Sequence, residues 1–196
     1  MYQGFQYDVS HYIVLNLVEK ARANINFPKV VIMVTEKIGG TYILEYYILW
    51  FFFTVSIISI FFWIRNQPIK DWIIVFFIKG FLSGFVDSFV VAYNLIEYPI
   101  RFLPDVFQIQ ILFDLLAFPI LCVIYNQTSY RSSIKGILLQ AVLYSLPMSA
   151  LEYWALKNTR LIVYHHWNIG MTFLFLAITF LMVRGSIGLI RKYSEP

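Results

Sequence analysis

The chain has 196 residues, of which 60% are hydrophobic and 13% are charged, and its mean hydropathy is +0.70. A soluble domain of this size still exposes about a third of its area, so it could not hide so much apolar surface. The composition therefore predicts a polytopic membrane protein and excludes disordered and coiled-coil chains. A net charge of +4 fits basic loops that face anionic lipid, and we expect no nucleic acid partner.

The first 41 residues differ from the rest of the chain. Over residues 8–23, apolar and polar residues alternate at roughly helical spacing, which predicts an amphipathic helix on the membrane surface. The apolar stretch at residues 30–34 is too short to cross a bilayer. We therefore expect an interfacial arm over residues 1–41 and a transmembrane bundle over residues 42–196.

Five later segments are apolar over roughly the length that a membrane helix needs, about 20 residues. Their apolar runs are continuous and do not alternate, which favours helices over barrel strands. The predicted spans are residues 43–64, 72–92, 109–125, 134–156 and 168–190, of which the third is short and contains Pro119. The expected fold class is an all-α membrane helix bundle of about five transmembrane helices, preceded by the N-terminal amphipathic helix.

The loops define two membrane faces. Face A holds the N-terminus, the aromatic segment 93–108 and the loop 157–167, whereas face B holds the other loops and the C-terminus. Each face carries seven basic residues, but Lys20 and Arg22 lie too far from the first span to count strongly. The remaining bias, five against seven, predicts that face B and the C-terminus are cytoplasmic.

The second span carries polar residues along one side. Lys79, Ser83 and Asp87 recur at every fourth position, which places them on one side of a helix. Gly80 and Gly84 form a small-xxx-small pair beside them, where another helix could approach closely. A charged side chain near the bilayer centre costs about 2.5–3.5 kcal/mol, so we expect this helix to be central in the bundle.

Polar residues gather toward face A. Asp87 and Asp114 are both offset from the centres of their spans toward this face, so we expect them to lie together on adjacent antiparallel helices, with Lys79 or Arg101 supplying compensating charge. The asymmetry predicts a polar cleft on face A, with structural pairing of the same residues as the alternative. The candidate binding residues are Asp87, Asn94, Glu97, Arg101, Asp114, Glu152, Trp167 and Asn168, with Lys79 as charge partner.

Arg101 has two readings from the sequence. Its planar guanidinium suits an anionic head group or carboxylate, which it could bind through two parallel hydrogen bonds. Alternatively, it neutralises Glu97 four residues earlier and anchors the segment. Cys122 is the lone cysteine and His165 and His166 are adjacent, so we expect no disulfide, metal site or cofactor.

Several short motifs follow one another in the second half of the chain. They are E-Y-P-x-R-F-L-P at residues 97–104, F-D-x-x-x-x-P at 113–119, Y-N-Q-T at 125–128, P-M-x-x-x-E at 147–152 and Y-x-x-W-N at 164–168. In this order they resemble a family of small multi-pass membrane proteins from endospore-forming Firmicutes that has no established activity. The resemblance implies a multi-pass protein of a bacterial plasma membrane, and the arm before residue 41 is not expected of every member.

Three hypotheses for the function follow. The first is a non-enzymatic binding, assembly or sensing component whose face A cleft engages membrane lipid, a lipid-like or small anionic ligand, or another membrane protein. The second is a small intramembrane enzyme acting on a lipid or isoprenoid, with Asp87, Asp114 and Glu152 as acids and bases. The third is a small transporter or substrate-capture subunit. Asparagine at positions 87 and 114 would abolish turnover by an enzyme but leave partner binding intact.

Overall fold

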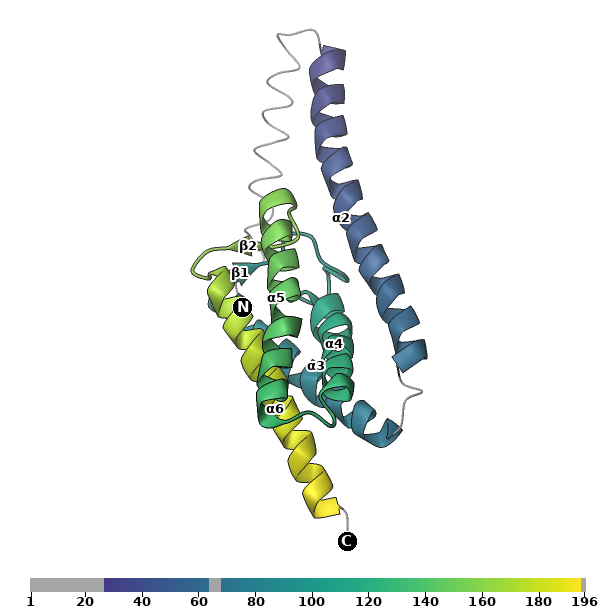
Figure 1. Ribbon diagram of the computed structural model, residues 1–196. Helices are drawn as coiled ribbons and strands as arrows, with labels where there is room; N and C mark the ends of the chain where they lie inside the picture. The colour runs from purple at the N-terminus through teal and green to yellow at the C-terminus, as the bar shows by residue number, and fades with distance from the viewer. Residues whose placement is uncertain (1–26, 64–67, 195–196) are drawn as a thin grey trace. The chain divides into compact units, whose positions relative to one another are not determined.

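The computed structural model describes residues 27–63 and 68–194, with side chains described for residues 43–62 and 68–193 (Figure 1). The chain divides into two compact units, Met1–Thr41 and Tyr42–Pro196. Everything below concerns the second unit. The amphipathic helix expected over residues 8–23 lies outside the described residues.

The described part of the chain is dominated by helices. They are α2 (Phe27–Trp63), α3 (Ile69–Ala92), α4 (Phe118–Thr128), α5 (Ile134–Asn158) and α6 (Ile169–Ser194), with the π-helix η1 (Phe113–Ala117) leading into α4. Four segments are long and apolar enough to span a membrane: Ile43–Phe62, Ile69–Ala92, Ile134–Asn158 and Ile169–Tyr193. The predicted all-α membrane architecture is confirmed at this level.

The third predicted span, residues 109–125, corresponds to a short apolar helix over Phe113–Thr128. At 1.5 Å per residue it covers about 24 Å, less than the roughly 30 Å of a hydrocarbon core. Gln110, which the prediction placed inside this span, is used by the preceding loop. Its side-chain amide donates to Ile100 O at 3.0 Å, and its Oε1 accepts from Phe102 N at 3.1 Å.

Pro119 accounts for the π-helical turn. Proline has no N–H, and its ring clashes with the carbonyl four residues back in a regular helix. The chain widens here so that Phe118 N donates to Phe113 O, five residues earlier. Asp114 lies in this widened turn and is buried.

Contacts between distant segments define the two ends of the bundle. At the strand end, β1 (Ile96–Glu97) pairs antiparallel with β2 (Val163–Tyr164) and joins the end of α3 to the start of α6. At the arginine end, Arg191 of α6 pairs with Asp71 of α3, and Arg184 donates to carbonyls just after α4. The helix from Phe113 to Thr128 therefore connects the two ends. The strand end corresponds to face A and the arginine end to face B.

The glycines of α3 let η1 and α4 pack closely against it. A Cβ added at Gly84 would lie 3.3 Å from Leu115 Cδ2, and one added at Gly80 would lie 3.5 Å from Pro119 Cγ. The predicted close approach is therefore confirmed. The opposite side of α3 carries exposed phenylalanines at every fourth position, namely Phe77, Phe81, Phe85 and Phe89. Such a surface suits lipid, so α3 turns its polar side inward.

Candidate functional site

Asp87 of α3 and Asp114 of η1 form a carboxyl pair inside the bundle. The two carboxyl groups lie close enough to share a hydrogen bond, and such a bond needs a proton on one of them, because two ionised carboxylates in contact repel. Neither Oδ2 atom receives a hydrogen bond from an N–H or hydroxyl group of the described residues. A proton shared by the pair accounts for both unpartnered oxygens.

Tyr98 donates a hydrogen bond to one oxygen of this pair. It lies just after β1, and its hydroxyl donates to Asp87 Oδ1 at 2.9 Å. Burial, together with the nearby charge of Asp87, raises the pKa of Tyr98 well above its ordinary value. The Tyr98 hydroxyl therefore stays protonated and acts as a permanent donor.

Glu152 of α5 is held by hydroxyl groups of β2 and α6. Its Oε1 accepts hydrogen bonds from Tyr164 and, at 2.9 Å, from Thr172. Trp167 Nε1 donates to the same threonine hydroxyl at 2.9 Å. Burial and the charge of Glu152 raise the pKa of Tyr164 above its ordinary value, so Tyr164 also remains a donor.

Lys79 is fully buried on α3, two helical turns before Asp87. Its ammonium group donates to Thr179 Oγ1 at 2.7 Å and lies 5.4 Å from the ring centre of Phe180. Rings of Phe118 and Phe175 also lie within 6 Å, a geometry in which aromatic faces attract a cation. Lys79 interacts electrostatically with Asp114. Of the two residues expected to supply compensating charge, Lys79 and Arg101, it is therefore Lys79 that lies beside the carboxyl pair.

Two cavities meet at these residues. The polar cavity, of about 60 Å³, is lined by Lys79, Ser83, Asp87, Trp167 and Thr172 among others. The apolar cavity, of about 110 Å³, lies between α2, η1 and α5; its walls include Ile48, Phe52, Phe113, Met148 and Leu151. Tyr98, Asp114, Phe118 and Glu152 line both cavities and form what we call the shared wall.

The structure thus brings together five of the nine residues that the sequence singled out. Lys79, Asp87, Asp114, Glu152 and Trp167 all line the polar cavity.

Three of the other four sit at the strand end with local structural roles. Asn94 adopts a φ of 54° and ends α3, a left-handed position that asparagine tolerates. Asn168 caps α6, because its Oδ1 accepts from Met171 N at 3.0 Å. Glu97 is exposed and contacts His165 Nε2 at 3.1 Å. These three residues line neither of the two cavities described above.

The guanidinium of Arg101 binds the backbone of its own loop. Its guanidinium donates to the backbone carbonyls of Phe107 at 2.6 Å, Tyr98 at 2.8 Å and Pro104 at 3.3 Å. The predicted pairing with Glu97 is wrong, because Glu97 instead contacts His165. The loop after β1 is irregular, so its carbonyls lack helix or sheet partners and Arg101 satisfies them. In this way Arg101 shapes the loop that carries Tyr98.

Sequence reasoning missed Tyr98, Tyr164, Thr172 and Gln110, which hold the site in place. Tyrosines near the ends of membrane spans ordinarily read as interfacial anchors. In the structure Tyr98 directly follows β1 and Tyr164 is the last residue of β2, and the helical spacing used for the spans gave no signal for either position.

Comparisons of the chain with models of protein families, with curated proteins and with solved structures give no match. Any function assigned to the chain therefore rests on its own residues.

Proposed function

We propose that this chain is a binding protein of a bacterial plasma membrane that holds an amphipathic, lipid-like molecule, with no catalytic step. The apolar part of the ligand occupies the apolar cavity, and its polar end meets the shared wall. Ligand sites are typically apolar pockets with a few convergent polar groups that fix orientation. The observation that carries the proposal is that Asp114, Glu152 and Tyr98 all line the otherwise apolar cavity.

The charge of the site indicates the chemistry of the polar end. Three carboxyl groups (Asp87, Asp114, Glu152) surround the polar cavity against one ammonium group, that of Lys79. Arg101, on which an anionic ligand would depend, is committed to three backbone carbonyls. The site therefore favours a ligand whose polar end carries hydrogen-bond donors, such as hydroxyl or amine groups, over an anionic one.

The test begins with the compound that remains on the protein. The full chain is purified in mild detergent, and its organic extract is identified by mass spectrometry against an extract of Asp114→Leu/Glu152→Leu. We expect one amphipathic compound enriched on the wild type and depleted on the variant. Identical extracts from two folded proteins would remove the proposal.

The carboxyl pair favours one second candidate, a hydrolase. Two aspartates that share a proton can act together, the ionised one taking a proton from water and the protonated one donating to the substrate oxygen. Asp87→Asn and Asp114→Asn discriminate the two functions. A hydrolase loses turnover of the co-purified compound in both variants, whereas a binding protein retains the compound unchanged.

The membrane topology is part of the same proposal. We place five crossings in the bilayer, the fifth being the short helix Phe113–Thr128, and we place the arginine end in the cytoplasm. Support comes from contacts that put the two ends of this helix at opposite ends of the bundle. The motif resemblance to small membrane proteins of endospore-forming Firmicutes agrees with this location.

A further inference from the structure

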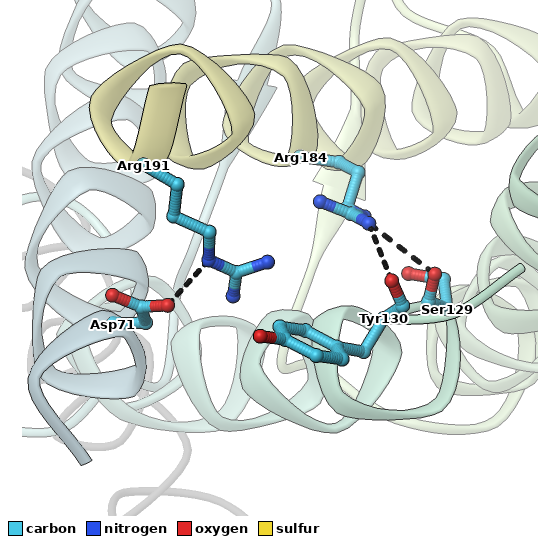
Figure 2. A network of polar contacts seen from close by, with 5 residues as sticks. All are labelled: Asp71, Ser129, Tyr130, Arg184 and Arg191. Carbon is cyan, nitrogen blue, oxygen red and sulfur yellow. Dashed lines mark hydrogen bonds and ion pairs between the residues drawn. The ribbon is translucent and has the colours of Figure 1, made fainter. Parts of the chain in front are cut away.

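Two arginines of α6 converge at the arginine end, away from the cavities. Arg184 and Arg191 are seven residues apart, two helical turns, and therefore lie on one side of α6. Figure 2 shows both side chains extending from α6 toward Tyr130, with Arg191 on the side of Asp71 and Arg184 on the side of Ser129. The guanidinium of Arg191 lies 4.2 Å from the Tyr130 ring centre, and Arg184 donates to Tyr130 O at 3.2 Å.

The pair has more positive charge and more donors than the protein uses. Asp71 is the one carboxylate paired with the two guanidinium groups in the described part of the chain, which leaves an excess of one positive charge. Arg184 Nε and Arg191 Nη2 are hidden from solvent and have no acceptor among the described residues. Ser129 Oγ and Trp72 Nε1, at the same end, are likewise buried without a partner. A buried charged N–H without an acceptor is costly, so these atoms favour an anion.

The surroundings favour a lipid as the source of that anion. Exposed Lys70, Arg131, Lys135 and Lys192 add positive charge at this end of the bundle. The Arg191 side chain remains 19% exposed and Arg184 is only partly buried, so both arginines can be reached from the surface. Basic pockets between membrane helices on the cytoplasmic side bind acidic head groups, and guanidinium groups match phosphate oxygens in two parallel hydrogen bonds.

We propose that Arg184 and Arg191 form a binding site for the phosphate group of an anionic phospholipid, above the ring of Tyr130. The site is independent of the cavities, since none of its residues lines the apolar or the polar cavity described above. One lipid bound there would tie the start of α3, the end of α4 and the end of α6 together.

Native mass spectrometry of the full chain in detergent tests the site with phosphatidylglycerol against phosphatidylcholine. We expect the wild type to bind one phosphatidylglycerol at least about tenfold more tightly, the effect of one charge-assisted hydrogen bond. Arg184→Gln should remove this preference. Arg191→Gln alone would leave the carboxylate of Asp71 without its ion-pair partner. The second variant is therefore Asp71→Asn/Arg191→Gln, which should also remove the preference. The matched control is Lys192→Gln, which deletes one exposed charge next to Arg191 and should keep the preference.

Three results would overturn the proposal. One is equal affinity of the wild type for the two lipids. Another is a loss of the preference for phosphatidylglycerol in Lys192→Gln as large as in Arg184→Gln, since the preference would then depend only on the overall charge. The third comes from a melting experiment in detergent. If inorganic phosphate raises the melting temperature as much as phosphatidylglycerol does, the site belongs to a soluble anion and not to a lipid.

Discussion

Gly84 and Leu115 are in close register across the α3–η1 interface, where a Cβ at position 84 would lie 3.3 Å from Leu115 Cδ2. This approach brings η1 close enough for Asp114 to reach Asp87. The absence of a side chain at position 84 allows this close approach.

Gly84→Leu should separate the two helices. We expect a loss of about 1–3 kcal/mol in the free energy of unfolding, typical of an overpacked interface, together with loss of the bound compound. The matched control is Gly185→Leu on α6, because a Cβ there would meet nothing within 4 Å. Thermal unfolding in detergent compares the stability of the two variants. Equal stability of the two variants would contradict the tight α3–η1 contact.

The shared proton predicts a specific order among substitutions of Asp114. Asparagine still offers an N–H donor to Asp87, whereas leucine offers none and leaves a buried carboxyl oxygen unpartnered. We expect Asp114→Leu to be less stable than Asp114→Asn by about 1–3 kcal/mol. The double variant Asp87→Leu/Asp114→Leu should recover only part of that loss, because it removes the unpartnered carboxyl group but leaves the Tyr98 hydroxyl without its acceptor. Three variants of equal stability would show that the two carboxyl groups do not interact.

Glu152 depends on hydroxyl donors from other elements. Tyr164→Phe removes one of its two donors, and we expect a loss of about 1–2 kcal/mol in unfolding free energy. Tyr153→Phe is the control, because Tyr153 is exposed on α5 beside Glu152. A Tyr164→Phe protein as stable as Tyr153→Phe would mean that Glu152 is not held by this hydroxyl.

Reporter fusions test the topology. Fusions after Gln67, Gln127 and Pro196 should all report the cytoplasm if five segments cross and face B is inside. A reporter outside the cytoplasm at Pro196 alone would overturn the orientation of the C-terminus. Opposite signals at Gln67 and Gln127 would show that the segment pair between them does not cross as a hairpin.

The helices and the inner side of α3 were predictable because lipid imposes simple constraints. Each spanning segment must be apolar and helical, so the runs ending near Phe62, Ala92, Asn158 and Tyr193 stand out in the sequence. Regular helical spacing then placed Lys79, Ser83 and Asp87 on one side. These three residues indeed line one cavity.

The loops were not predictable in the same way. The side chain of Arg101 goes to whichever carbonyls an irregular backbone leaves unpaired, and no residue spacing encodes that backbone. Nor does spacing show that Pro119 would widen one turn around Asp114, or that the side chain of Gln110 would bind the preceding loop. Four of the nine singled-out residues lay in such loops or at helix ends, where local hydrogen bonds and not helical spacing set the side-chain positions.

Filling the apolar cavity with a larger side chain shows whether an amphipathic ligand occupies it. Met148 lines the apolar cavity, whereas Met182 is exposed on α6. We would quantify, by mass spectrometry, the compound that co-purifies with the wild type, Met148→Trp and Met182→Trp. We expect Met148→Trp to lose the compound, because the larger side chain fills the cavity, and Met182→Trp to retain the wild-type amount. Full retention by a folded Met148→Trp protein would contradict it.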